Sequence, residues 1–295
     1  MKSNILFAAI LAVSLSSAAP AQQAMPADYS AVLTTLGRQG DFKDGVLKVN
    51  IPRNDLKVVV DGVATPTPFG FGGWVALTKG TGMDVMMGDL VLTEDEVNPV
   101  MSALLDNGLE VTAVHNHFFF ETPRIFYMHV HGHGSAADLA TKIKPALALI
   151  GKNPPKASAI TGRAIEGKLD TAQLAKIIGA EGEQNGMVYK ITIGRSDLSM
   201  KEMGATINAR MGLNTWAAFY GSDSDSVVAG DVAMLESEVT PVLKALRSNG
   251  IDVVAMHHHM IGTQPAVIFL HYWGKGDAQK LARGVKAAVD VLGKR

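Results

Sequence analysis

The sequence predicts an α+β fold in two tandem copies of one domain, each a mainly antiparallel sheet with helices packed on one face. A shift of 142 positions superimposes residues 88–151 on 230–293 without a gap, and 25 of these 64 positions are identical. Strand-like runs and helical patterns with capping residues follow one another in the same order in both copies. Hydrophobic residues form 47% of the chain and charged residues 19%, which is the balance of a globular protein.

Weaker matches extend the repeat upstream, through pairs such as Lys48/Lys190 and Trp74/Trp216. We therefore expect copy one at residues 27–151 and copy two at 169–293. Residues 152–168 contain Pro154-Pro155 and little apolar periodicity, which predicts a linker.

Each copy is expected to open with a short amphipathic helix, at 29–36 and 172–178. Strand-like runs follow at 46–51, 57–60, 74–77 and 85–92, with counterparts at 188–193, 217–220 and 227–235. The next helix ends at an Asn-Gly pair, and residues 111–117 and 125–131 then form an antiparallel hairpin around Pro123. Ser135 and Asp277 are the expected N-caps of the last helix, which stops at Gly151 or Gly293.

Residues 1–21 are predicted to be a signal peptide. Lys2 precedes an apolar run at 5–15, and Ala19-Pro20-Ala21 is a small-residue cleavage site, so the mature chain begins at Gln22. The apolar run is too short to span a bilayer as a helix. We therefore expect a periplasmic or secreted protein with no transmembrane segment in the mature chain.

Composition excludes several functions. The formal net charge is −1, which gives no electrostatic case for binding nucleic acid or an anionic membrane. The chain has no cysteine, and this excludes disulfides, thiolate nucleophiles, Cys-ligated zinc and iron–sulfur clusters. A small molecule or a cell-envelope ligand remains as partner, and the oligomeric state is not indicated.

All nine histidines lie in the two hairpins, and three pairs survive the shift of 142. These pairs are His115/His257, His117/His259 and His129/His271. On a strand, two histidines spaced His-x-His point the same way, about 6.5 to 7 Å apart. A register that brings the third histidine of a copy to this face gives the three-imidazole donor set of an open zinc site; copper, iron, nickel and manganese also suit imidazole. The alternative is hydrogen-bonded histidines in a core or at an interface. His131, His133 and His258 lack a partner under the shift and are treated as accessory.

Two carboxylates, Glu96 and Glu238, also match under the shift. If their helices start at Pro99 and Pro241, these glutamates are free to act as general bases or as fourth metal ligands. A capping box with Thr93 is the competing interpretation, although copy two has Leu235 there. Asp89 and Asp231 are expected to shape turns or to bond to backbone.

The motifs Glu96-Val97-x-Pro99, His115-Asn116-His117, Pro123-Arg124 and Tyr127-Met128-His129 resemble the LppY/LpqO family of bacterial secreted proteins and lipoproteins, which are built around a domain of unknown function. The resemblance covers nearly the whole mature chain and implies no particular activity.

Copy one keeps Asn116, Arg124 and Tyr127 beside its histidines as candidate substrate-binding residues, and Arg124 could hold an anionic group through a bidentate contact. Copy two has His258, Ala266 and Phe269 in these places. We therefore expect copy one to be the more competent site.

The leading hypothesis is an extracytoplasmic protein that binds a divalent transition metal, zinc first, at its His-x-His hairpins and works as a metal-dependent hydrolase or oxidoreductase. The alternatives are a non-enzymatic module that binds metal or an envelope ligand, and a structural protein with core histidines.

Overall fold

The computed structural model describes residues 24–152 and 161–294. The expected signal peptide, its cleavage site and Pro154-Pro155 lie outside the described residues. Copy one contains α1 (Ala27–Leu36), β1 (Asp41–Lys43), β2 (Val46–Pro52), β3 (Val58–Val60), β4 (Val63–Thr65), η1 (Thr67–Phe69), β5 (Gly72–Lys79), β6 (Asp84–Thr93), α2 (Glu94–Asp106), β7 (Glu110–His115), β8 (Glu121–Thr122), β9 (Ile125–Gly134) and α3 (Ala136–Leu147). Copy two contains α4 (Thr171–Ile178), β10 (Gly182–Asn185), β11 (Val188–Gly194), β12 (Lys201–Glu202), β13 (Ala205–Thr206), η2 (Ala209–Met211), β14 (Asn214–Gly221), β15 (Ser226–Leu235), α5 (Glu236–Ser248), β16 (Asp252–His257), β17 (Val267–Gly276) and α6 (Ala278–Val289).

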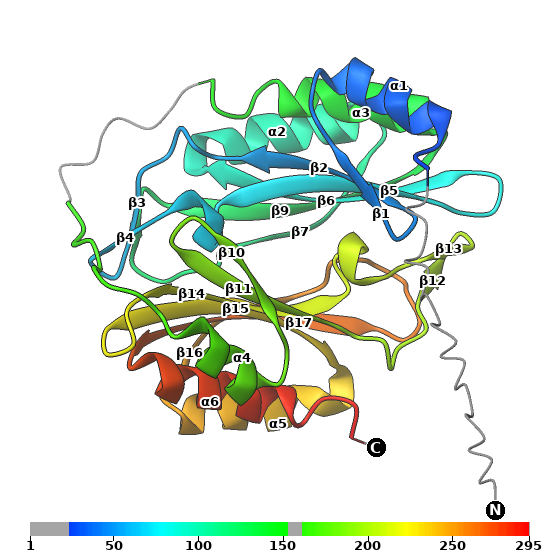
Figure 1. The fold of residues 1–295 in the computed structure, drawn as a ribbon. Coiled ribbons are helices and arrows are strands. Elements are labelled where there is room, and N and C mark those ends of the chain that lie inside the picture. Colours follow the sequence, from blue (N-terminus) through cyan, green and yellow to red (C-terminus); the bar gives the residue numbers. More distant parts are fainter. Residues whose placement is uncertain (1–23, 153–160, 295) are drawn as a thin grey trace, which may run out of the picture.

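Each copy is built on a six-stranded antiparallel sheet. The strand order is β1-β2-β5-β6-β9-β7 in copy one and β10-β11-β14-β15-β17-β16 in copy two. Figure 1 shows the helices of each copy on the outer face of its own sheet, while the inner faces of the two sheets lie toward each other. The predicted α+β class and the helices on one face are therefore confirmed. Among the described residues, no helix is both long and apolar enough to cross a bilayer.

Capping residues fix the last helix of each copy as the sequence predicts. The Ser135 hydroxyl accepts a hydrogen bond from the Asp138 N–H at 3.2 Å, and the Asp277 carboxylate accepts one from the Lys280 N–H at 2.8 Å. The apolar side of each helix then packs on its sheet, which gives each copy a core of its own.

The helices α2 and α5 begin at Glu94 and Glu236, so the interpretation that started them at Pro99 and Pro241 is wrong. The Glu96 carboxylate accepts a hydrogen bond from the Thr93 N–H at 2.9 Å, and Glu238 does the same for the Leu235 N–H at 2.7 Å. This bond uses only the backbone of the residue before the helix. Leucine at position 235 is therefore compatible with the same helix start.

Both oxygens of these glutamates are already bound. Glu96 accepts from Arg53 Nη1 at 2.6 Å and from the Gly151 N–H at 2.7 Å, inside the buried side of copy one. Glu238 forms the matching bonds with Arg195 and Gly293. In the part of the chain that the structure describes, neither glutamate lines the cavity beside the histidines.

The two sheets are joined by two apolar clusters that contain residues of both copies. One of them packs Phe69 of copy one against Tyr220 and Trp273 of copy two. The other packs Met200 and Met211 of copy two on the inner face of sheet one. The hairpins β3–β4 and β12–β13 each reach the opposite copy. Asp61 in the turn of the first pairs with Lys275 at 3.2 Å, and the Met203 carbonyl in the turn of the second accepts a hydrogen bond from the Thr81 N–H. The described end of the linker is also attached, since the Arg163 N–H donates to the Gly62 carbonyl.

Candidate metal centre

Strand register decides which face the histidines occupy. In copy one His129 lies directly opposite Ala113 on β7, and a register shift separates Val111 from Ala113. Directly opposite residues point to the same face, and His115 is two residues beyond Ala113. His115 and His129 therefore share the inner face of sheet one. The register of His271 opposite Ala255 repeats this arrangement in copy two.

The six paired histidines meet between the two sheets in one cluster. They form three close contacts, each between one imidazole of copy one and one of copy two. The ring centroids are 3.6 Å apart for His115/His257, 3.5 Å for His117/His271 and 4.0 Å for His129/His259. The shift of 142 maps the first contact onto itself and exchanges the other two. The cluster is thus arranged about the pseudo-twofold axis that relates the copies.

Two triads bring ligand nitrogens within 4.8 Å of one another: His115 with His257 and His271, and His129 with His257 and His259. Among the described residues, several of these nitrogens are buried and have no hydrogen-bond partner, including His115 Nε2 and His271 Nε2. His259 Nε2 has the Asp231 carboxylate 3.7 Å away. Buried polar atoms are nearly always paired in proteins. Imidazole nitrogens with no partner, gathered from three directions, fit a transition metal ion.

The six imidazoles are neutral at ordinary pH. Burial lowers the pKa of His115 to about 4. Burial and the neighbouring imidazoles hold the pKa of His117, His259 and His257 well below the usual range. His129 and His271 are shifted in the same direction, chiefly by burial. Neutral imidazole is the form that binds a metal.

Contacts behind the rings orient the lone pairs. His271 Nδ1 lies 3.2 Å from the Gly230 carbonyl, and because a carbonyl only accepts, Nδ1 carries the proton and Nε2 is left free for the cluster. His117 stacks on Tyr127 with ring centroids 3.3 Å apart, and His259 stacks on Phe269 at 3.4 Å. Such outer contacts fix the orientation of metal-binding histidines in known sites.

The three candidate substrate-binding residues are placed differently from one another. The buried Tyr127 donates its hydroxyl to the Gly70 carbonyl at 2.9 Å and presents its ring to His117. Asn116 Nδ2 donates to the Phe118 carbonyl, and Arg124 is exposed after the cis peptide before Pro123. Of the residues that the structure describes, these three are not among those lining the cavity.

The accessory histidines lie outside the cluster. His131 sits between Glu202 of copy two at 2.7 Å and Glu110 at 3.2 Å. Burial alone would lower the pKa of His131, but the two glutamates outweigh it and raise that pKa. His133 and His258 are exposed.

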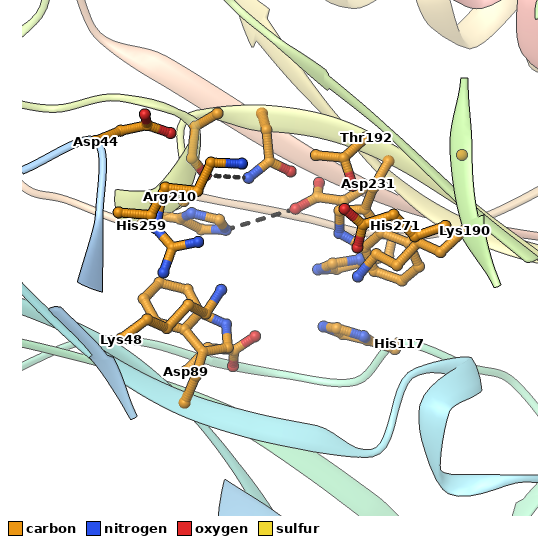
Figure 2. A pocket seen from close by; sticks show the side chains of 18 of the residues that line it. Asp44, Lys48, Asp89, His117, Lys190, Thr192, Arg210, Asp231, His259 and His271 are labelled. Atoms are coloured by element: carbon orange, nitrogen blue, oxygen red, sulfur yellow. Dashed lines mark hydrogen bonds and ion pairs between the residues drawn. The ribbon is translucent and has the colours of Figure 1, made fainter. Parts of the chain in front are cut away.

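A cavity of about 440 Å³ adjoins the cluster and is lined in part by His117, His259 and His271. Three further pairs related by the shift line it. Lys48/Lys190 and Asp89/Asp231 are labelled in Figure 2, and the third pair is Trp74/Trp216. The aspartates do not shape turns, because they lie within β6 and β15, opposite His129 and His271. The alternative, a bond to backbone, holds for Asp231, which bonds to the backbone of Leu270 and Val232. All six residues are identical in type between the two copies. Polar side chains that recur at the same strand positions in both copies could have indicated the site from the sequence.

Tandem α+β copies with a shared, buried histidine cluster define a candidate metal-binding protein. The chain belongs to the family described as Domain of Unknown Function (DUF1259), whose model matches residues 30–149 and 172–291. The match supports one domain repeated twice, while the likeness to LppY/LpqO proteins stays a resemblance. No curated protein matches the chain.

Solved structures with similar segments include shell proteins of bacterial microcompartments. A trimeric shell protein, PduB, is 13% identical, with 86% of this chain and 90% of that chain covered and a TM-score of 0.22. EtuB from Clostridium kluyveri is 8% identical, with 85% and 88% covered and a TM-score of 0.20. At such TM-scores these likenesses carry no argument about fold or function.

Proposed function

We propose that this protein is a binding module that holds one divalent transition metal ion between its two copies. The observation that carries the proposal is the convergence of six neutral imidazoles from both copies, with ligand nitrogens within 4.8 Å in two triads. Both triads use His257, so the simplest stoichiometry is one ion per chain. Three imidazoles and one open position suit zinc, and copper, iron, nickel and manganese are the competing ions. The predicted signal peptide supports a periplasmic or secreted location.

The test is elemental analysis of protein purified without an affinity His-tag, before and after treatment with a chelating resin. We expect about one ion per chain before treatment. His257→Ala should weaken metal binding by on the order of 100-fold or more, because it removes a member of both triads. The exposed His133 provides the matched control, and His133→Ala should bind metal as the unmodified protein does. Absence of metal, with only micromolar or weaker affinity for every ion tried, would leave a structural role for the histidines.

The shared cluster also bears on the expectation that copy one is the more competent site. Each close contact joins the two copies, so the ligands belong to one centre rather than to two. His257→Ala, a substitution in copy two, should therefore lower metal affinity at least as much as His115→Ala or His129→Ala in copy one. A centre built by copy one alone would keep its affinity in His257→Ala.

A metal-dependent hydrolase or oxidoreductase is the second candidate, favoured by the cavity that reaches three of the imidazoles. In this hypothesis Glu96 and Glu238 are the predicted general bases. Their bonds to Arg53 and Arg195 argue against that role. Turnover of ester, phosphoester or redox substrates by the metal-loaded protein, lost in His257→Ala, would support this candidate.

A further inference from the structure

Two lysines in the cavity lie against aromatic rings and, within the described part of the chain, form no ion pair. Lys48 Nζ lies 4.3 Å from the centroid of the Trp74 ring, and Lys190 Nζ lies 4.1 Å from that of Trp216. Cation–π contacts of this kind hold an ammonium group in place without neutralising it. Neither ammonium forms an ion pair with any residue that the structure describes.

The two ammonium groups also oppose each other. Burial lowers the pKa of both lysines to about 8. The charges of Lys190 and Arg210 lower the pKa of Lys48 further, while the carboxylates of Asp89 and Asp41 raise it. The carboxylates of Asp231, Asp89 and Glu183 raise the pKa of Lys190. Arg210 is itself paired with Asp41 at 2.5 Å. Buried ammonium groups that form no ion pair cost free energy, because they lose their solvation by water. An anion between them is the group that would remove this cost.

The wall of the cavity on each sheet also offers hydrogen bonds, beside the lysine of that sheet. Asp89 lies across from Trp74 and Asp231 across from Trp216 in the strand registers, so both carboxyl groups reach the cavity beside the indoles. Among the described residues, one oxygen of each is buried and without a hydrogen-bond partner. A carboxyl group bonds to a hydroxyl whether it is ionised or protonated. The wall therefore fits a molecule that carries hydroxyl groups.

We propose that the cavity binds a small hydroxycarboxylate, with its carboxylate between Lys48 and Lys190 and its hydroxyl groups on Asp89 and Asp231. The volume of about 440 Å³ lies in the range of small-molecule sites. His117, His259 and His271 line the same cavity, so the bound molecule lies next to the proposed metal centre. The contacts of the two lysines do not involve the metal ion, however, so this inference does not rest on the metal centre.

Calorimetric titration with three four-carbon probes tests the site. Tartrate carries carboxylates and hydroxyls, succinate only carboxylates and threitol only hydroxyls. We expect tartrate to bind and the other two to bind at least about tenfold more weakly, since about 1.4 kcal/mol of lost contacts is tenfold in affinity. Equal binding of succinate and tartrate would overturn the role of the aspartates, and no binding of tartrate at millimolar concentration would overturn the site.

Substitutions locate the carboxylate. Lys48→Met and Lys190→Met should each lower tartrate affinity at least about tenfold, because each removes a positive charge from the carboxylate site. Lys48→Gln is a second variant that also removes the positive charge at position 48. Lys57→Met is the control, because Lys57 is exposed and outside the cavity lining. Unchanged affinity in the cavity variants would refute the proposal. Protein stripped on a chelating resin is titrated in parallel: tartrate binding that persists without metal supports the lysine site even if the metal centre fails, and binding seen only with metal refutes it.

Discussion

Arg53 shows how much of this sequence serves the fold rather than a reaction. Its guanidinium is buried and binds Asp55, Glu96 and the Val91 carbonyl. Through Glu96 the same network holds the start of α2 and the Gly151 N–H after the last helix. Arg195 and Glu238 repeat it in copy two. One side-chain pair thus ties together three distant segments of each copy.

Replacing Glu96 by glutamine should destabilise the protein without changing its metal content. The substitution leaves Arg53 buried with one carboxylate fewer, and breaking a buried pair in this way costs about 3 to 5 kcal/mol. Chemical denaturation of Glu96→Gln gives the free energy of unfolding, and the exposed Glu94→Gln serves as control. A loss below about 1 kcal/mol in Glu96→Gln would show that the pair is not a structural requirement.

Replacing a lysine of the cavity should affect stability in the opposite direction, by stabilising the folded protein. Because the folded-state pKa of Lys48 is about 8 instead of 10.5, the unfolded chain binds more protons between these values, and stability from this group rises with pH across that window. The charged groups that act on Lys48 are Lys190, Arg210, Asp89 and Asp41. Lys48→Met should therefore melt at a higher temperature than the unmodified protein at pH 7, and the difference should shrink toward pH 10. A difference in melting temperature that stays constant with pH would contradict the lowered pKa of Lys48.

At the scale of elements, periodicity and caps predicted most helices and strands, but not the face of each histidine. The three matched histidine pairs and the hairpin follow from the repeat and from alternation. Whether His129 shares a face with His115 depends on the register shift after Val111. No residue type in the hairpin predicts this shift. The starts of α2 and α5 were open for a similar reason, since the decisive partner of Glu96 is Arg53, 43 residues earlier.

The short helix η1 should matter more than its length suggests. Phe69 is fully buried and contacts Phe118 of its own copy and Tyr220 and Trp273 of the other. Phe69→Ala should cost about 3 to 5 kcal/mol in the free energy of unfolding, as for other large core truncations. Phe120 is 81% exposed, so Phe120→Ala should change it by less than about 0.5 kcal/mol. Similar values for the two variants would mean that η1 does not anchor one copy on the other.

For the whole molecule, the sequence predicted two copies but not their contact. A shift of 142 gives the equivalent residues, and says nothing about whether His115 meets His257 or lies far from it. The contact depends on inner faces that are apolar at their margins, where Phe69 and Met211 pack, and polar along the axis. That division is visible only once both sheets are in place.

Metal should raise the melting temperature of the whole protein rather than of one copy. An ion held by residues of both copies binds only the assembled state, and at 100 times its dissociation constant it adds about 2.7 kcal/mol. Calorimetric scans at increasing zinc concentration should therefore show one transition that moves upward, while His257→Ala shows none of this movement. Identical scans with zinc and after treatment with a chelating resin would contradict an ion between the copies.

The arrangement about the pseudo-twofold axis has a consequence for shorter chains. One copy carries only three of the six imidazoles and only one of the two lysines. A polypeptide with a single copy would complete the centre and the cavity only by homodimerisation, with its partner across a true twofold axis. Joining two copies in one chain makes this pairing independent of concentration. It also allows the two copies to differ in sequence. Arg210 and Asn214 are an example, because they line the cavity from copy two only.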